Sequence, residues 1–244
     1  MAKKTALVTG GAGGIGSAIC VELAGKGMKV FAGYHPTEEP GAKAKLKEWQ
    51  AAGIDISIVP GDVSAFASCA EMAKATGPVD ILVNCAGITR DKSLRKMTEE
   101  DWHAVLDVDL NSLFNVTKQY IDAMADKGYG RIINISSVNG KKGQFGQTNY
   151  SAAKAGVHGF TMALAQEVAR KNVTVNSVSP GYTETAMTKA IDPEITKQIV
   201  AQVPAGRMAQ PEEIAYTVGF LADERAGYIT GANISVNGGL FISF

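Results

Sequence analysis

Tyr150 and Lys154 are the residues of this chain whose types and spacing most clearly suggest chemistry. They lie four positions apart near the start of a predicted helix, so their side chains share one helix face. A phenol has an ordinary pKa of about 10, but a nearby ammonium favours the phenolate and makes proton exchange easier near neutrality. Ser137 follows a predicted strand, where its hydroxyl can hydrogen-bond and orient a substrate oxygen. Because Tyr-x-x-x-Lys is common by chance, it predicts acid–base catalysis only in combination with a binding site for a reactant.

A glycine-rich turn, residues 9–16, follows the first predicted strand and opens the first predicted helix. It fits two spacings, G-x-G-x-x-G from Gly11 and T-G-x-x-x-G-x-G from Thr9. Backbone N–H groups at a helix N-terminus can approach a pyrophosphate there, since no Cβ intervenes. A tight turn alone would also use glycine, but the strand–turn–helix context predicts dinucleotide binding. The predicted contacts are Gly10, Gly11, Ala12, Gly13, Gly14, Ile15 and Gly16.

Short apolar runs alternate with helical segments along the chain. This alternation indicates βαβ units and a parallel sheet whose strands are buried on both faces. No linker or change in composition divides the chain, so residues 1–244 are predicted to form one α/β domain, a doubly wound Rossmann fold with helices on both faces of the sheet. The expected strands cover residues 6–8, 29–32, 54–59, 80–83, 131–135, 173–178 and 234–236, and the expected helices cover residues 15–26, 41–52, 65–75, 99–124, 150–168 and 211–221.

Residues 184–208 fit this alternation least well. They begin just after a predicted strand end, where open α/β sheets bind ligands, and they include Met187, Pro204 and Met208. Loops in this position often close over a substrate, so we expect a mobile substrate lid. A plain surface excursion is the alternative.

The composition excludes several classes of partner. Lys plus Arg and Asp plus Glu both number 24, so no overall field attracts nucleic acid or an anionic membrane. No run approaches the roughly 20 apolar residues of a membrane span, and the N-terminal apolar stretch is too short for a signal peptide. Cys20, Cys69 and Cys85 lack metal-ligand spacing and are expected to be free thiols in a reducing compartment. We therefore expect a cytoplasmic protein without a metal, a nucleic-acid partner or a membrane partner.

In combination, these motifs carry a family resemblance: the chain is similar to the short-chain dehydrogenase/reductases over essentially its full length. The matching motifs are residues 9–16, Asp62-Val63, residues 84–87, Ser137, Tyr150-x-x-x-Lys154 and Pro180-Gly181. The resemblance implies an NAD(P)H-dependent oxidoreductase in which Tyr150, Lys154 and Ser137 are catalytic, and the first two also contact the cofactor. It implies a cofactor groove that further includes Gly61, Asp62, Val63, Asn84, Cys85, Ala86, Gly87, Ile88, Pro180, Gly181 and Thr183.

Two positions depart from the family pattern. Cys85 stands where the motif N-N-A-G has its second Asn, and we expect little change because that stretch acts largely through its backbone. Asp109 stands where the family's fourth catalytic residue is usually Asn. An Asp keeps an acceptor and the size of the side chain, but it loses the amide donor and can add charge near Lys154. Asn111 faces elsewhere on a helix, so we predict that Asp109 fills the fourth catalytic position in a working site.

The turn after the second predicted strand bears on which nicotinamide cofactor binds. NADP-binding members of the family usually place Arg or Lys in the glycine loop or after this strand to meet the 2′-phosphate. Here the glycine loop has neither residue, and the turn contains Tyr34, Glu38 and Glu39. Carboxylates would repel a 2′-phosphate but can accept from a 2′-hydroxyl, so NAD(H) is favoured over NADP(H), with Tyr34 and Glu38 as cofactor contacts. Alternatively, both Glu side chains point to solvent, or His35 contacts a phosphate.

Several segments indicate a substrate by resemblance within the family. Residues 136–150, 88–91 and 113–119 resemble those of bacterial acetoacetyl-CoA reductases, and residues 87–91 and 202–207 are shared with 3-oxoacyl-(acyl-carrier-protein) reductases. The resemblance implies reduction of acetoacetyl-CoA to (R)-3-hydroxybutyryl-CoA, which in a bacterium would supply polyhydroxybutyrate synthesis. The candidate substrate contacts are Asp91, Ser137, Gln144, Phe145, Gln147, Tyr150 and Tyr182.

Two alternative functions stay open. A 3-oxoacyl-(acyl-carrier-protein) reductase needs a basic surface for an acidic partner, and Arg90, Lys92, Arg95 and Lys96 supply a modest cluster that suits CoA phosphates equally. The second alternative is a dinucleotide-sensing regulator without activity. Asp109 is its only support, and the complete catalytic set argues against it.

Members of this family are commonly tetramers, built on the long helices that here carry Asp109 and Tyr150 and on the C-terminal strand region. The resemblance therefore implies a homotetramer. Apolar residues that exceed the need of one core face agree with this: Leu106, Leu110, Leu113, Met162 and Leu164. Residues 237–244 also end in apolar side chains, as expected of a segment that docks on a neighbouring subunit.

Overall fold

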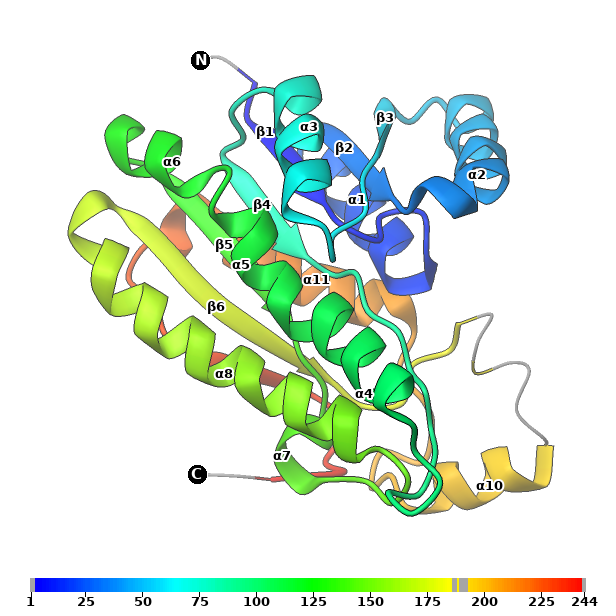
Figure 1. The fold of residues 1–244 in the computed structure, drawn as a ribbon. Helices are drawn as coiled ribbons and strands as arrows, with labels where there is room; N and C mark the ends of the chain where they lie inside the picture. Colours follow the sequence, from blue (N-terminus) through cyan, green and yellow to red (C-terminus); the bar gives the residue numbers. More distant parts are fainter. Residues whose placement is uncertain (1–2, 186–187, 189–192, 243–244) are drawn as a thin grey trace.

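Seven strands pair into one sheet in the computed structural model, which describes residues 3–185, 188 and 193–242 (Figure 1). The strand order is β3-β2-β1-β4-β5-β6-β7, and all neighbours are parallel. Every strand expected from the apolar runs is confirmed, with ends within two residues of those expected. The strands are β1 (Thr5–Val8), β2 (Lys29–Tyr34), β3 (Ile56–Pro60), β4 (Ile81–Asn84), β5 (Gly130–Ile135), β6 (Val173–Pro180) and β7 (Asn233–Val236).

Helices cover both faces of this sheet (Figure 1). One face carries α1 (Gly14–Gly25), α2 (Glu39–Ala51) and α11 (Pro211–Leu221). The other carries α3 (Phe66–Thr76), α4 (Glu99–Leu106), α5 (Ser112–Thr117), α6 (Ile121–Lys127) and α8 (Thr148–Val168). The shorter elements are η1 (Pro36–Glu38), η2 (Asp107–Asn111), α7 (Asn139–Lys142), η3 (Ala169–Lys171), α10 (Pro193–Ala201) and η4 (Glu224–Ala226). Within the described residues, no helix combines the length and apolar character needed to cross a membrane.

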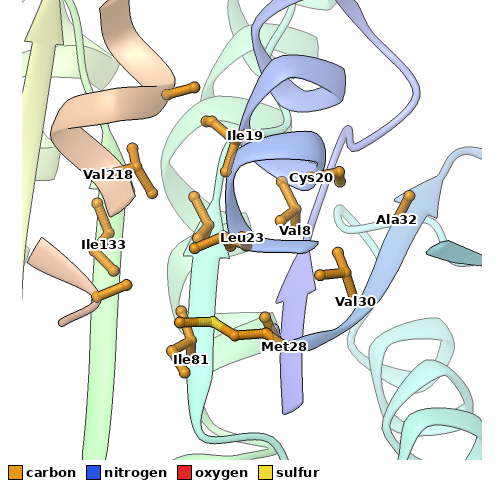
Figure 2. Packing of buried hydrophobic residues seen from close by; sticks show 14 of the residues in the cluster. Val8, Ile19, Cys20, Leu23, Met28, Val30, Ala32, Ile81, Ile133 and Val218 are labelled. Carbon is orange, nitrogen blue, oxygen red and sulfur yellow. The ribbon is translucent and has the colours of Figure 1, made fainter. Parts of the chain in front are cut away.

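The central strands supply apolar side chains to both faces, as continuous apolar runs predict. In β1, Val8 packs with the α1 and α11 side, whereas its neighbour Leu7 packs with the α3 and α8 side. Figure 2 shows the first of these clusters, where Leu23 of α1 and Val218 of α11 lie over strand residues that include Ile133. Each such fully buried side chain contributes roughly 1.5–3 kcal/mol, so both faces hold the sheet rigid beneath the site.

The helical region expected over residues 99–124 is interrupted twice. α4 runs into a π-helical turn, η2, before α5 begins. Residues 118–120 then form a turn between α5 and α6. A π turn inserts one extra residue and rotates the side chains that follow. This turn contains Asp109, whose side chain is directed into the protein.

Two helices lie where none was expected. α7 follows the end of β5, and α10 lies within the segment 184–208 that was expected to form a lid. Parts of that segment, residues 186–187 and 189–192, lie outside the described residues, and so does the predicted Met187. The segment is therefore partly helical rather than a continuous loop.

The sheet has one topological switch point. β1 lies between β2 and β4, so the direction in which successive strands are added reverses at β1. Open α/β sheets bind ligands in the crevice beyond the strand ends at such a point. The glycine turn follows β1 and residues 85–88 follow β4, so two of the predicted cofactor motifs meet there.

Candidate active site

The glycine turn is held tightly against the end of β4. Gly10 has a φ of 63°, and a Cβ at this position would be 3.0 Å from the Cα of Ala86. The Oγ1 atom of Thr9 accepts hydrogen bonds from the backbone N–H groups of Cys85 (3.0 Å) and Ala86 (3.1 Å). A Cβ on Gly16 would overlap the carbonyl oxygen of Gly10. Glycine is thus required at the first and last glycine positions of the T-G-x-x-x-G-x-G spacing.

The N-terminus of α1 has the features of a phosphate site. Its N-cap residue, Gly13, offers no side-chain cap, so the first N–H groups of the helix are available to a ligand. Gly13 and Gly14 are exposed. Thr185, which follows β6, lies directly over this turn, because a Cβ on Gly14 would be 2.8 Å from its Cγ2 atom. A pyrophosphate here would be enclosed between the first turn of α1 and Thr185.

The ends of β2 and β3 form the side of the groove predicted to hold adenosine. The Gly61 N–H donates to the Tyr34 carbonyl at 2.9 Å. The Asp62 carboxylate accepts from the backbone N–H (2.9 Å) and hydroxyl (2.7 Å) of Ser64 and lies 3.8 Å from Nε2 of His35. Burial raises the pKa of Asp62, but the Ser64 hydrogen bonds and His35 lower it below its usual value. This carboxyl is ionised at neutral pH and can accept from a ligand.

Two predicted cofactor residues turn their side chains away from the groove. Val63 packs in the core on the α3 side, and its carbonyl accepts from Nδ2 of Asn115 at 3.0 Å. Asn84 donates through its side chain to Oδ1 of Asn134 at 2.8 Å, inside the sheet. Both residues can therefore face a cofactor only through their backbone. Cys85 is anchored through its backbone N–H, which donates to Thr9, while its side chain packs against the core on the α1 side, so no amide is needed there for these contacts.

β6 delivers the residues predicted to lie beside a nicotinamide. It ends at Pro180, and the Gly181 N–H donates to the Val236 carbonyl at 2.8 Å. Thr183 is buried, bridges to Ala209 as an isolated parallel pair, and donates from its hydroxyl to the Gly181 carbonyl at 3.2 Å. Residues 181–183 are therefore held by hydrogen bonds to β7 and to Ala209.

Tyr150, Lys154 and Ser137 meet beyond the ends of the central strands. Tyr150 is in the first turn of α8 and Lys154 one turn later, with its Nζ 5.6 Å from the centroid of the Tyr150 ring. Lys154 is 4% exposed, and its Nζ donates to the Ile135 carbonyl at 3.1 Å. Ser137 follows β5 and accepts from the Asn139 N–H at 3.1 Å. Tyr150 thus lies close to both of the other expected catalytic residues, Lys154 and Ser137.

Neighbouring groups both raise and lower the pKa of the Tyr150 phenol. Burial raises its pKa most, and the Lys154 ammonium lowers it. Asp109 raises the pKa again, the Ser137 hydroxyl lowers it, and Asp91 raises it slightly further. The resulting pKa lies above the ordinary value, so Tyr150 keeps its proton at neutral pH and can donate it.

Asp109 occupies the predicted fourth catalytic position. Its Oδ1 accepts from the Ile88 N–H at 2.8 Å, and its Oδ2 lies 3.1 Å from Nζ of Lys154. Asn111 is exposed and donates instead to the Asp107 carboxylate at 2.8 Å. Asp109, not Asn111, therefore reaches Lys154.

Comparison with known proteins decides the family. Residues 4–196 match the model of the short chain dehydrogenase family. The chain belongs to the short-chain dehydrogenase/reductases. It is therefore an oxidoreductase of a family that uses NAD(P)(H).

Relatives of this dehydrogenase match it from end to end. An acetoacetyl-CoA reductase from Allochromatium vinosum is 57% identical, and one from Cupriavidus necator is 55% identical, each over 98% of this chain and 99% of the relative. A 3-oxoacyl-(acyl-carrier-protein) reductase from Escherichia coli is 46% identical over 98% of both chains. The crystal structure of an Agrobacterium tumefaciens protein, provisionally named a gluconate dehydrogenase, has a TM-score of 0.92 at 32% identity and covers 97% of this chain and 95% of its own.

The polar residues predicted to contact the substrate of this dehydrogenase are hydrogen-bonded to one another or to near neighbours. Nε2 of Gln147 donates to Asp91 at 2.8 Å, and its Oε1 accepts from Asn139 at 2.9 Å. Gln144 accepts from Nζ of Lys142 at 2.7 Å. These contacts tie the loop before α4 to the loop before α8, so both loops form one polar rim.

Phe145 and Tyr182, which were also predicted to contact the substrate, differ in exposure. The Phe145 side chain is 91% exposed and contacts little of its own subunit. Tyr182 is half-buried and lines a small pocket with Val203, Arg207 and Val236. Burial raises the pKa of the Tyr182 phenol, so it stays protonated at neutral pH.

Two positioning residues were missed by sequence reasoning. Ser136 donates from its hydroxyl to the Lys154 carbonyl at 2.8 Å and so fixes α8 against β5. Asn149 is fully buried, accepts from the Tyr150 N–H at 2.8 Å, and donates to a carbonyl of α4 at 3.1 Å. The sequence offered one signal for them, since each directly precedes a predicted catalytic residue.

Proposed function

We propose that this enzyme reduces acetoacetyl-CoA to (R)-3-hydroxybutyryl-CoA with a reduced nicotinamide cofactor. The observation that carries the proposal is the Tyr150–Lys154 pair in the first turns of α8, in the same domain as the uncapped glycine-rich N-terminus of α1. The end-to-end match to two acetoacetyl-CoA reductases, at 57% and 55% identity, supports the substrate. In a bacterium, the product would supply polyhydroxybutyrate synthesis.

The predicted cofactor contacts suit the three parts of a dinucleotide. The uncapped N-terminus of α1 would hold the pyrophosphate, Asp62 the adenosine, and Thr183 the nicotinamide end. A bound NAD(P)H supplies the hydride that reduces the 3-keto carbon.

The side chains handle the proton and the orientation of the substrate. Ser137 would donate a hydrogen bond to the keto oxygen and fix its direction. Tyr150 gives its hydroxyl proton to that oxygen as the hydride reaches the carbon, which completes the alcohol. The Lys154 ammonium stabilises the phenolate that Tyr150 leaves behind.

The polar rim and the exposed aromatic side chain are proposed to hold the thioester arm. Phe145 offers an apolar surface at the mouth, and Tyr182 closes the opposite side. Gln144, Gln147 and Asp91 can exchange their present hydrogen bonds for bonds to the amide groups of the arm. Since these bonds would be exchanged rather than added, their net contribution to affinity is small, about 1 kcal/mol each.

We further infer that NAD(H) is the preferred cofactor. Glu38 is exposed at the end of η1, after the strand whose end meets the ribose in this fold. Its carboxylate can accept from a ribose 2′-hydroxyl and would repel a 2′-phosphate. Tyr34, the other predicted contact, is buried at the end of β2, so a cofactor would meet it mainly through its backbone.

The quaternary structure and the lid complete the proposal. A homotetramer is supported by Met162, which is 52% exposed on α8. Leu113 is buried within the subunit and Leu164 packs against its core, so these two serve the subunit itself.

Residues 184–208 would act as a substrate lid over the single domain. Free thiols at all three cysteines suit a cytoplasmic location.

A 3-oxoacyl-(acyl-carrier-protein) reductase is the second candidate. The Escherichia coli relative and the basic residues of the loop before α4 support it. Lys92 of that loop is paired with Asp101 at 2.7 Å, which offsets part of its charge. A smaller basic surface suits the phosphates of CoA better than an acidic protein.

Side-by-side turnover of acetoacetyl-CoA and acetoacetyl-carrier protein tests the proposal. We expect a higher kcat/KM for the CoA thioester, and we expect Tyr150→Phe to lower it by about 10²- to 10⁴-fold, because the proton donor is lost. Tyr228→Phe, at a fully exposed tyrosine, is the matched control and should retain activity. A higher kcat/KM for the carrier protein would favour the second candidate. Absence of turnover in the wild type would contradict both candidates and leave a regulator, whereas full turnover in Tyr150→Phe would refute Tyr150 as the proton donor.

A further inference from the structure

Asp109 places a carboxylate inside the catalytic centre, where the family pattern has a neutral amide. Its side chain is 0% exposed and that of Lys154 is 5% exposed. One carboxylate oxygen is held by the Ile88 N–H at 2.8 Å, and the other lies 3.1 Å from the Lys154 ammonium. Burial raises the pKa of the Asp109 carboxyl above its ordinary value, while the Lys154 ammonium and the Ile88 N–H act against this by stabilising the charged form. The direct contact at 3.1 Å therefore sets a carboxylate against an ammonium.

The Asp109–Lys154 pair leaves no room for a side chain at the position of Gly87. A Cβ on Gly87 would be 2.9 Å from Oδ2 of Asp109 and 3.3 Å from Nζ of Lys154. Nζ also donates to the Ile135 carbonyl at 3.1 Å. Lys154 is thus fixed between a strand end, a π-helical turn and the residues after β4. The ammonium lies 5.6 Å from the centroid of the Tyr150 ring.

The charges that face Tyr150 and Lys154 come from several elements. Tyr150 and Lys154 themselves lie on α8, Asp109 on η2, Cys85 after β4, and Asp91 in the loop before α4. Burial raises the pKa of Cys85 to about 11, so its thiol is neutral. Burial lowers the pKa of Lys154, but Asp109 raises it and keeps the ammonium charged. Asp109 therefore supplies the closest negative charge to the catalytic lysine.

We infer that Asp109 is a positioning residue whose counter-charge on Lys154 sets the pH range in which Tyr150 holds its proton. The inference rests on the proposed reduction, in which Tyr150 must be protonated to act. A lysine without this counter-charge would stabilise the phenolate more strongly and draw the proton from Tyr150 at lower pH. Asp109 thereby extends the pH range of reduction toward alkaline pH. It also moves the onset of the reverse oxidation, which needs the phenolate, to higher pH.

The test is Asp109→Asn, which keeps the size of the side chain and removes its charge. The pH profile of kcat/KM is measured for acetoacetyl-CoA reduction and for 3-hydroxybutyryl-CoA oxidation. We expect the alkaline fall of reduction and the rise of oxidation both to move to lower pH in the variant. Asp107→Asn is the matched control, since it makes the same change in the same π-helical turn, where Asp107 accepts from Asn111 at 2.8 Å. Its profile should coincide with that of the wild type.

A second measurement does not need turnover. The ultraviolet absorbance of the phenolate is titrated in the cofactor-free protein, with the Tyr150→Phe curve subtracted. Asp109→Asn should move the Tyr150 transition to lower pH and Asp107→Asn should not. An unmoved transition would overturn the inference even if kcat fell, because a purely structural role lowers the rate without moving the midpoint. A moved transition in a protein that does not reduce acetoacetyl-CoA would uphold the inference while refuting the proposed substrate. If Asp109→Asn does not fold, the smaller neutral variant Asp109→Ser takes its place under the same criterion.

Discussion

Glu38 and Glu39 are adjacent carboxylates with different surroundings. Glu39 lies on α2 and pairs with Lys43 one turn later, Oε1 to Nζ at 2.7 Å. Glu38 ends η1 and forms no ion pair with any described residue. Nδ1 of His35 and Oγ1 of Thr37, 2.7 Å apart, hold the turn that carries it. A ribose 2′-phosphate would therefore meet the uncompensated charge of Glu38, while that of Glu39 is already offset.

Glu38→Ala is expected to change the choice of cofactor. The wild type should have the higher kcat/KM with NADH, and the variant should raise the ratio of NADPH to NADH use by about tenfold, since that corresponds to about 1.4 kcal/mol of removed repulsion. Glu39→Ala is the control and should leave the ratio nearly unchanged. A wild type that prefers NADPH would refute the assignment of NAD(H).

At the scale of elements, the start of α4 is joined to the catalytic helix. Thr98 and Asp101 form a reciprocal capping box at the N-terminus of α4. Asp101 also pairs with Lys92 at 2.7 Å, and its backbone carbonyl accepts from Asn149, the residue before Tyr150. A change at this cap is therefore transmitted to the first turn of α8.

Asp101→Asn is expected to destabilise the protein in a pH-dependent way. The hydrogen bonds from Lys92 and Thr98 lower the pKa of Asp101 to about 2 from its ordinary 3.8. Because the folded pKa is depressed, the stabilisation is fully present above the ordinary value and is lost as pH falls toward about 2. Urea unfolding should show a lower midpoint for the variant at neutral pH, with the difference shrinking below pH 3.8. A difference that stays constant through that range would contradict the assignment.

Local sequence signals predicted some elements of the site and could not predict others. The apolar period and the Tyr150–Lys154 spacing are local, so α8 and the proximity of these two side chains could be predicted from the sequence alone. The direction of the Asp109 side chain in the π-helical turn depends on contacts with Ile88 and Lys154, which lie far away in the sequence. The side-chain direction of Asn84 likewise depends on Asn134 in a neighbouring strand. Periodicity carries no information about such contacts.

At the scale of the whole molecule, an aromatic pair stands exposed on the helical face that carries α8. Phe66 of α3 and Phe114 of α5 stack with ring centroids 5.9 Å apart. They are 47% and 57% exposed, although side chains of this kind usually lie in a core or an interface. Met162 of α8 is half-exposed on the same side of the sheet. This face agrees with a homotetramer built on these helices.

Phe114→Asp is expected to dissociate that tetramer into smaller species. A carboxylate in a buried interface would lose its hydration without a partner, and the aromatic contact would be lost as well. Light scattering coupled to size-exclusion chromatography measures the mass directly. Val21→Asp, on α1 at the opposite face, should leave the mass unchanged. A wild-type mass of one subunit would refute the tetramer.

The strand order also bears on how the chain is made. β2 pairs with β1, β3 with β2, β4 with β1, and each later strand with the one before it. Every strand thus finds its neighbour already synthesised, and the sheet can grow outward from β1 as the chain leaves the ribosome. The glycine turn and residues 85–88 are in place once β4 has joined, long before the last strand emerges. A nascent chain that ends after β4 would already hold the phosphate-binding half of the groove.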